Sequence, residues 1–489
     1  MNTTAIRRSI PFAQLPPVRT DPPAFARWRD YPAGIGGYNA IITSDSLSTR
    51  LSRLSSKLFS EVINLHIIDI NDIRGSTTCA TTLYERAAEV ESILCQPDEQ
   101  LPRVRIISLH SAKSLGPLQI SESLMRKVLT RYEVDPAFLS VLYSFGGAPH
   151  LAENGSSNET SRTIEEGSHN LIYQIRYSEE NQRSRDSPWS VRQTGVYHHH
   201  SSTKKFDLFI ILHPLNESVL ERRLLEFGLP QSDARGLTSI FENPYRLHIL
   251  PFASYLENWR WYFRSLGKEF QKKNDEIMTL DLETLQLGTP AAVTQNFDKM
   301  LGLRDLQDTS LSLSAHCKSS LEIIEKFQEI PSADFQGVWS LNSYKTQLVG
   351  YVENMSVLTK RIGNTIDLFA YALDLKNQST AADTNNHVSQ LAETTTRDTA
   401  AVKWITYLTL LYLPGSFVAS IYGMNLFVFN QQTMKIMIAD DFWICIATWI
   451  PLTLLTFLCY GLLVLRHKDR AENGWHWLNT SKSSTLKGP

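Results

Sequence analysis

The chain has 489 residues and a formal net charge of −2, with 42% hydrophobic and 20% charged residues. This length predicts two or three domains, and the near-neutral charge argues against a nucleic-acid partner. The five cysteines form no CxxC pair, which argues against a disulfide framework or a zinc knuckle.

The first half of the chain is predicted to be a loose tail followed by a folded domain. Proline pairs indicate a flexible tail over residues 1–55, without the apolar core of a secretory signal peptide. Residues 56–275 are predicted to form an α/β domain, because strand-like apolar runs alternate with helix-like spacing. The expected strands are 62–70, 104–109, 171–177, 189–197 and 206–212, and the expected helices are 81–94, 120–132, 217–227 and 252–270.

Two polar features of this region carry separate expectations. Residues 153–186 are rich in polar side chains and are predicted to be a mobile insertion. His198, His199 and His200 form a run at the end of an expected strand without cysteines or acids beside them in sequence. This run is interpreted as a solvated loop in preference to a metal site.

Residues 276–403 are predicted to form a long helical stalk. Apolar residues there step by three, four or seven, and Thr359 fills the one gap in the stripe. Such a stripe packs either within one chain or between subunits, and its spacing does not separate the two. Residues 377–399 are polar, as in a linker. The stripe comprises Leu348, Val352, Met355, Ile362, Ile366, Phe369 and Leu373.

Two segments free of Lys, Arg, Asp and Glu predict two transmembrane helices within residues 404–465, joined by the loop 426–441. Residues 404–422 and 442–465 each approach the roughly 20 residues that cross a bilayer. Lys403 precedes the first span, and several bases follow the second. The positive-inside rule therefore places both termini, including the tail 466–489, in the cytosol and the loop outside.

Two helices cannot enclose an aqueous path, so a conducting protein of this kind must be an oligomer. The first span carries hydroxyl side chains on one helical face, and Asp398 upstream falls on the same face. This face either lines a pore or holds helices together through hydrogen bonds. The hydroxyl residues are Thr406, Thr409, Ser416 and Ser420.

The sequence Tyr422-Gly423-Met424-Asn425 closes the first span and resembles a motif of the CorA family of divalent-cation transporters. The run from Tyr412 to Ser420 resembles the fungal CorA-like branch. The resemblance extends over residues 388–470. It implies a homopentamer with span one lining the pore, and it implies that residues 377–399 continue this helix as a cytosolic stalk.

The resemblance further implies that Gly423, Met424 and Asn425 form an outer filter, with Asn425 the residue that meets the ion. Bacterial members often carry Met-Pro-Glu in the outer loop, and this chain lacks it. Asp440 and Asp441 either attract cations there or cap the second span.

Together these features predict an oligomeric channel or transporter for divalent cations, with Mg²⁺ as the expected cargo. The alternatives are a Zn²⁺, Ni²⁺ or Co²⁺ transporter of the same architecture and a non-conducting membrane-anchored interaction or sensing protein. No P-loop or Gly-X-Ser-X-Gly motif occurs, so no enzyme activity and no cofactor are expected. The expected partners are copies of the chain and the lipid bilayer. The plasma membrane is the preferred location, with vacuolar and mitochondrial membranes as alternatives.

Overall fold

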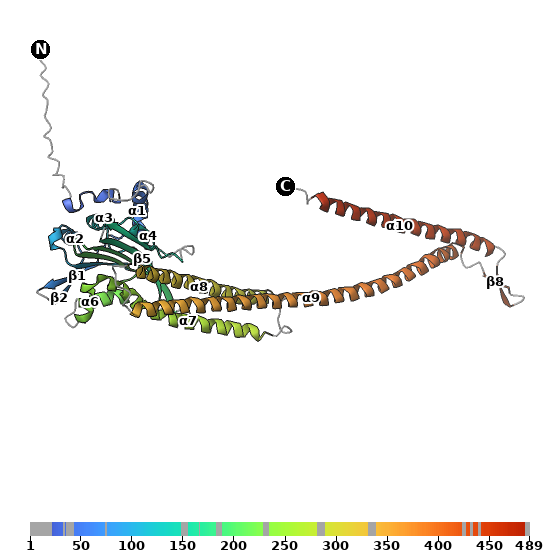
Figure 1. Cartoon of the computed structure of the whole chain (residues 1–489). Coiled ribbons are helices and arrows are strands. Elements are labelled where there is room, and N and C mark those ends of the chain that lie inside the picture. Colours follow the sequence, from blue (N-terminus) through green and yellow to red (C-terminus); the bar gives the residue numbers. More distant parts are fainter. Residues whose placement is uncertain are drawn as a thin grey trace, which may run out of the picture. The chain divides into compact units, whose positions relative to one another are not determined.

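The computed structural model describes most of the chain, in two units, Met1–Leu373 and Asp374–Pro489. Figure 1 shows the elements of both. The described residues are 22–32, 35, 44–73, 76–147, 155–165, 167–181, 188–227, 234–280, 289–330, 339–422, 427–430, 434–438 and 442–484.

The first unit is built on a seven-stranded sheet with the order β2-β1-β3-β7-β6-β5-β4. β3 and β7 run parallel, and the other neighbours pair antiparallel. Every residue of β3 and β7 is buried, and most residues of both strands are apolar. The strands are β1 Leu65–Ile73, β2 Ser76–Tyr84, β3 Val104–His110, β4 Thr160–Glu165, β5 Ser168–Glu180, β6 Trp189–Ser201 and β7 Phe206–His213.

Helices cover both faces of this sheet (Figure 1). Side chains alternate between two cores along each strand, so Ile67 joins one core while Ile68 joins the other. The first core is closed by α1 Ser44–Leu58, α2 Ala87–Leu94, α3 Glu122–Arg131 and α4 Phe138–Tyr143. The second is closed by α5 Val219–Glu226, α6 Ala234–Glu242, α7 Ile249–Met278, α8 Pro290–Gln328 and the first part of α9 Trp339–Ile421. The predicted α/β domain is therefore confirmed.

The stretch predicted as a loose tail is ordered wherever the structure describes it. Two short 3-10 helices, Pro23–Phe25 and Trp28–Asp30, precede α1. The side chains of Phe25 and Tyr31 are buried in the first core, and Arg126 of α3 donates to the carbonyl of Tyr31 at 2.8 Å. The prediction from proline content is wrong here because the aromatic side chains in this stretch bury large apolar areas and so fix the chain to the core.

Strands also replace the predicted polar insertion. β4 and β5 lie within residues 153–186, and β5 pairs with β6 over its whole length. Polar side chains on these strands bond to each other, as where Gln174 donates to Gln193 at 3.0 Å. The prediction of a mobile insertion from polar composition is therefore wrong for these strands, because polar side chains that are hydrogen-bonded to each other can be buried in a sheet.

The expected helix 81–94 also begins in the wrong place. Its first residues belong to the end of β2, an edge strand rich in threonine.

The heptad stripe packs within the chain. Its members Leu348, Met355, Ile362, Ile366 and Phe369 are buried in the second core, together with residues of α7 and α8. Thr359, at the gap in the stripe, shares a 2.7 Å hydrogen bond with Ser310 of α8. The open choice between packing within one chain and packing between subunits is thus resolved in favour of one chain for this part of α9.

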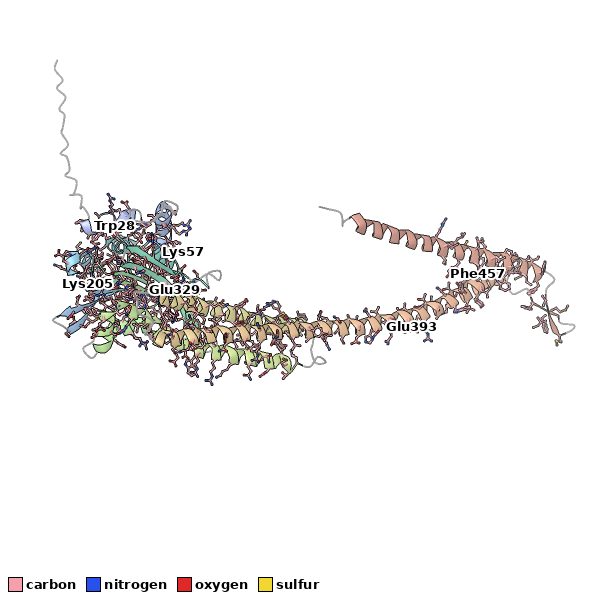
Figure 2. All side chains as sticks on the ribbon, viewed as in Figure 1. Trp28, Lys57, Lys205, Glu329, Glu393 and Phe457 are labelled. Atoms are coloured by element: carbon pink, nitrogen blue, oxygen red, sulfur yellow. The ribbon has the colours of Figure 1, made fainter. Side chains whose placement is uncertain are left out.

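The second unit contains the rest of α9, a two-stranded sheet and α10 Phe442–Ser484. α9 remains helical through residues 377–399, where a linker was an open alternative, and its side chains around Glu393 are exposed (Figure 2). The predicted outer loop contains strands β8 Phe427–Asn430 and β9 Lys435–Ile438. Apolar side chains on both strands are exposed, including Phe427 and Phe429 on β8 and Ile436, Met437 and Ile438 on β9.

Candidate functional site

α9 and α10 each contain a segment long and apolar enough to cross a membrane. In both segments most side chains are exposed. Pro414 lies within α9 and Pro451 within α10 without ending either helix. Charge-free helices with this much exposed apolar surface are typical of membrane proteins.

The four hydroxyl residues of the first span lie on α9, and each donates a hydrogen bond to a carbonyl of its own helix. Thr409 bonds to Ile405 at 2.7 Å, and Ser420 bonds to Ser416 at 2.8 Å. Thr406 and Ser416 make the same kind of bond. Because these bonds use the hydroxyl proton, the oxygen lone pairs stay available to water or to a cation.

The hydroxyl stripe and the contact with α10 use different sides of α9. The Tyr407 ring packs edge-on against Tyr460, with 6.0 Å between centroids. A side chain at Gly415 would bring its Cβ within 2.9 Å of Trp449 Nε1. At about 100° per residue, Tyr407 and Gly415 lie roughly opposite the hydroxyl stripe. The direct contact with α10 is therefore centred away from the hydroxyl stripe.

Open grooves flank the contact between these helices. One, of about 750 Å³, is lined by Thr409 and Ser416 together with apolar residues including Trp449. A second, of about 430 Å³, is lined by Ser416, Ser420 and residues of α10. Both grooves are predominantly apolar, so they suit lipid chains or side chains of another helix.

The motif residues Gly423, Met424 and Asn425 lie outside the described residues, as do Asp440 and Asp441. The described chain ends before the motif at Tyr422 and resumes at 427. Asp398 is exposed on α9 and makes no ion pair with any described residue. The structure thus brings the hydroxyl residues and Asp398 onto one helix, while the filter assignment stays a prediction.

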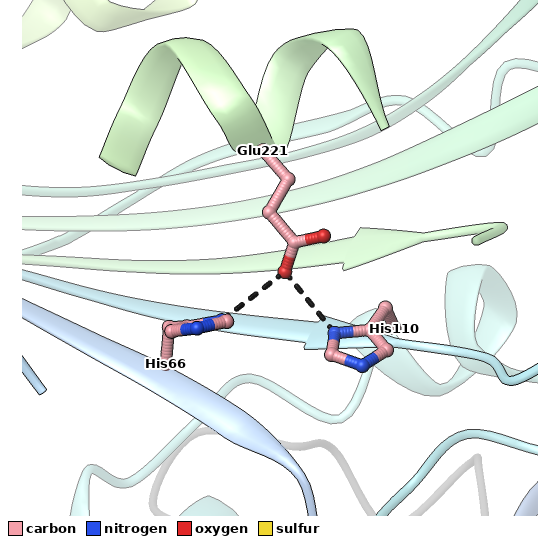
Figure 3. Close-up of side chains that lie close together, drawn as sticks. All are labelled: His66, His110 and Glu221. Carbon is pink, nitrogen blue, oxygen red and sulfur yellow. Dashed lines mark hydrogen bonds and ion pairs between the residues drawn. The ribbon is translucent and has the colours of Figure 1, made fainter. Parts of the chain in front are cut away.

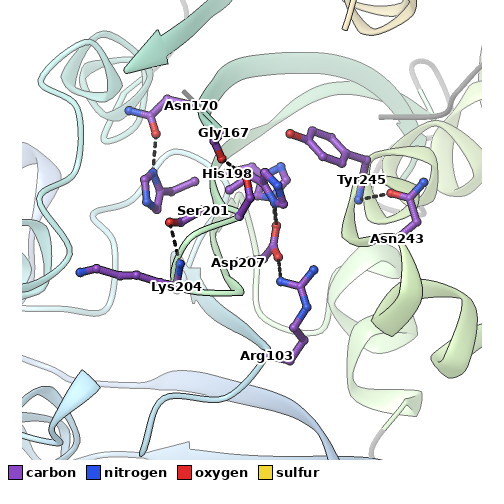
Figure 4. Close-up of polar contacts among 12 residues, drawn as sticks. Arg103, Gly167, Asn170, His198, Ser201, Lys204, Asp207, Asn243 and Tyr245 are labelled. Atoms are coloured by element: carbon purple, nitrogen blue, oxygen red, sulfur yellow. Dashed lines mark hydrogen bonds and ion pairs between the residues drawn. The ribbon is translucent and has the colours of Figure 1, made fainter. Parts of the chain in front are cut away.

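The histidine run at 198–200 lies in strand β6, so its interpretation as a solvated loop is wrong (Figure 4). His198 and His200 both bond to Asp207 Oδ1, at 3.0 and 2.7 Å, and Arg103 pairs with the other carboxylate oxygen. Burial alone would raise the pKa of Asp207, but the two histidine bonds hold that pKa well below its usual range. The sequence alone does not reveal Asp207 as the partner of these histidines, because it lies on the next strand, after a turn.

Comparison with known proteins gives a family. The sequence pattern of a family described as CorA-like transporters matches residues 24–278, just over half of the chain. The match covers the sheet domain and α7, whereas the resemblance seen in sequence rests on the C-terminal segment. A search of curated proteins returns no match.

Among solved structures, the chain is similar to the full-length CmaX protein, with a TM-score of 0.38 and 12% identity over 82% of this chain and 97% of that one. It is also similar to the ZntB cytoplasmic domain from Vibrio parahaemolyticus RIMD 2210633, with a TM-score of 0.27 and 11% identity over 66% of this chain and 98% of that one. The family match is the finding that identifies the protein: the chain belongs to the CorA-like transporter family.

Proposed function

We propose that the protein is a homo-oligomeric channel for divalent cations, with Mg²⁺ as its cargo and α9 lining the pore. Membership of a transporter family supports movement of a solute across a membrane. The observation that carries the pore assignment is the position of the hydroxyl stripe, roughly opposite the side of α9 that meets α10.

The oligomer follows from the number of spans. Two apolar helices per chain cannot surround a water-filled path, so several α9 helices must surround it together. Val388, Thr395, Val402, Thr409 and Ser416 step by seven along α9, and Val388 and Val402 are 57% and 60% exposed. A seven-residue step of small and β-branched side chains is the pattern of a seam between helices. The resemblance to the CorA family favours five subunits.

The chemistry of this seam suits a hydrated cation. The part before the span offers exposed Val388 and Val402, and the part within the membrane offers Thr409 and Ser416. Hydroxyl oxygens with free lone pairs accept hydrogen bonds from the water around the ion. Asp398 lies on the same side of α9, just before the span, where a ring of carboxylates raises the local cation concentration.

The proposed filter is Gly423-Met424-Asn425, directly after the last described residue of the first span. Mg²⁺ dehydrates reluctantly, and neutral amide oxygens from an Asn425 ring bond to its hydration shell without stripping it. Neutral ligands also hold the ion weakly enough for release. Asp440 and Asp441, at the start of the second span, attract cations to the same mouth.

The energy source in this proposal is the membrane potential. The sequence contains no nucleotide-binding motif. A divalent ion gains about 4.6 kcal/mol per 100 mV, twice the value for one charge. With both termini in the cytosol, as the basic residues flanking the spans indicate, an inside-negative potential drives uptake. The plasma membrane provides such a potential.

The test compares two asparagine variants of the full chain in lipid vesicles containing a Mg²⁺-sensitive dye. Asn425→Ala is expected to lose Mg²⁺ entry while keeping the oligomer mass of the wild type. Asn430→Ala, a matched change five residues later in β8, is expected to conduct normally. Wild-type flux in an assembled Asn425→Ala oligomer would refute the filter assignment.

The same vesicles decide between cargoes. The outer loop lacks the Met-Pro-Glu sequence found in bacterial members, which favours testing Zn²⁺, Ni²⁺ and Co²⁺ beside Mg²⁺. Selective entry of one of these ions would replace Mg²⁺ as the cargo. Background flux of every ion through correctly assembled wild type would favour a non-conducting sensing protein.

A further inference from the structure

The sheet of the first unit contains two clusters in which two histidines share one carboxylate oxygen. In the first, Asp207 is bonded by His198 and His200 (Figure 4). In the second, Glu221 of α5 is bonded by His66 of β1 and His110 of β3 (Figure 3). The two clusters resemble each other in residue types and differ in charge and in unpaired atoms.

The clusters differ in charge because different groups bind the second oxygen of each carboxylate. Arg103 pairs with the free oxygen of Asp207 and neutralises its charge. Among the described residues, Glu221 has no lysine or arginine partner: its second oxygen accepts the backbone N–H of Glu217 at 2.8 Å. The Asp207 cluster is therefore a completed structural network, whereas the Glu221 cluster keeps a negative charge that a cation can balance.

The second cluster has the spacing of metal ligands. His66 Nδ1 and His110 Nδ1 lie 3.3 and 3.1 Å from Glu221 Oε1. One ligand atom from each of the three residues can be chosen so that all lie within 4.8 Å of one another. Tetrahedral Zn²⁺ with bonds of about 2.0–2.1 Å separates its ligand atoms by roughly 3.3–3.4 Å. Only small side-chain movements are needed to hold such an ion.

Two buried histidine nitrogen atoms beside the cluster lack partners among the described residues. The side chain of His110 is fully buried, and its Nε2 has no hydrogen-bond partner among the described residues. His213, its neighbour in register on β7, has an unpartnered Nε2 as well. Buried polar atoms without partners are rare and often mark a bound water, and such a water beside the cluster would satisfy these Nε2 atoms while the Nδ1 atoms of His66 and His110 face Glu221. His66, with 16% of its side chain exposed, gives the cluster access to solvent.

We propose that His66, His110 and Glu221 bind a transition-metal ion of the Zn²⁺ class within the sheet domain. Imidazole ligands favour Zn²⁺, Co²⁺ and Ni²⁺, whereas Mg²⁺ prefers oxygen ligands, so the site selects against the proposed cargo. When the ion binds, each histidine carries its proton on Nε2 and frees Nδ1 for the metal. The ion then ties α5 to β1 and β3. This site does not depend on the proposed function.

The test measures metal binding to the untagged full chain in detergent, with a chromophoric zinc chelator as competitor and Co²⁺ as a spectroscopic probe. The wild type is expected to bind one Zn²⁺ at this site and to give Co²⁺ the visible absorption of a tetrahedral complex. Glu221→Gln and the milder His66→Ala are expected to lose that spectrum and to weaken Zn²⁺ binding more than about 100-fold, beyond the usual effect of changing a residue that touches a ligand but not the metal.

Two controls separate metal binding from folding. His200→Ala removes one histidine from the Asp207 cluster and is expected to leave Zn²⁺ stoichiometry and the Co²⁺ spectrum unchanged. His66→Cys replaces one zinc ligand by another and is expected to restore binding. Unchanged metal binding in both His66→Ala and Glu221→Gln would overturn the proposal, as would a wild type that binds no Zn²⁺. Ion flux plays no part in this readout, so the outcome is independent of the channel test.

Discussion

The ion pair between the buried Arg105 and the partly exposed Asp69 gives the most quantitative prediction about the fold. The two residues are partners in register on β3 and β1, and their side chains form a bidentate pair with both bonds at 2.8 Å. Arg105 is only 2% exposed. Asp69→Asn removes the charge while keeping the shape, which leaves a guanidinium buried without a counterion.

The expected loss follows from the remaining bonds. Removing one partner of a buried pair costs about 3–5 kcal/mol; because Asp69 is 26% exposed and Arg105 keeps bonds to Tyr132 and Gln96, at most the low end, about 3 kcal/mol, applies. Unfolding entropy of about 2.1 cal/mol/K per residue gives roughly 0.8 kcal/mol/K for the unit Met1–Leu373. Tm should therefore fall by up to about 4 °C.

Thermal unfolding followed by circular dichroism measures this change. Replacing both partners by apolar residues, Asp69→Leu with Arg105→Met, should recover most of the lost stability because no charge stays buried. Glu89→Gln, which removes an exposed pair with Arg86, should shift Tm by less than about 1 °C. A Tm for Asp69→Asn that matches this control, or a double variant as unstable as the single one, would refute the reasoning.

Three further predictions concern packing, pH and the pore. Gly195→Val should lower the free energy of unfolding of the sheet domain by about 1–3 kcal/mol in chemical unfolding, because a Cβ there would lie 2.4 Å from a side chain of α4. The control Gly267→Ala, on the open surface of α7, should raise it slightly. Burial lowers the pKa of His199 from 6.5 to about 4, so its contribution to stability is complete above pH 6.5 and is lost as the pH falls toward 4; His199→Gln should flatten the fall of Tm measured across that range. Thr409→Val should reduce divalent-cation flux several-fold in vesicles, while Thr448→Val on α10, which removes an equivalent bond to a helix carbonyl, should leave flux unchanged.

The parts of the fold that were predictable are those whose residue pattern is local in the sequence. β3 and β7 are mostly apolar, and α3 and α5 repeat apolar residues at helical spacing. The sequence predicts a helix where β2 ends, since an exposed edge strand of threonines lacks an apolar face. The burial of Phe25 and the pairing within β5 depend on distant partners, which local composition does not reveal.

The candidate sites divide in the same way. The hydroxyl stripe from Thr406 to Ser420 was predictable because all four residues share one helix and its period. The cluster at Glu221 was not, since His110 and His66 lie 111 and 155 residues away in sequence on separate strands. Only the register of the sheet and the position of α5 bring these three side chains together.

Voltage-driven flux tests the central claim most directly. Full-length wild-type protein, reconstituted in vesicles without nucleotide, should admit Mg²⁺ at a rate that rises as the interior is made more negative, since about 4.6 kcal/mol per 100 mV acts on each ion. Such entry, lost in Asn425→Ala, is the predicted result. Mg²⁺ entry that stays at the level of protein-free vesicles at every potential, from oligomers of confirmed mass, would contradict the account.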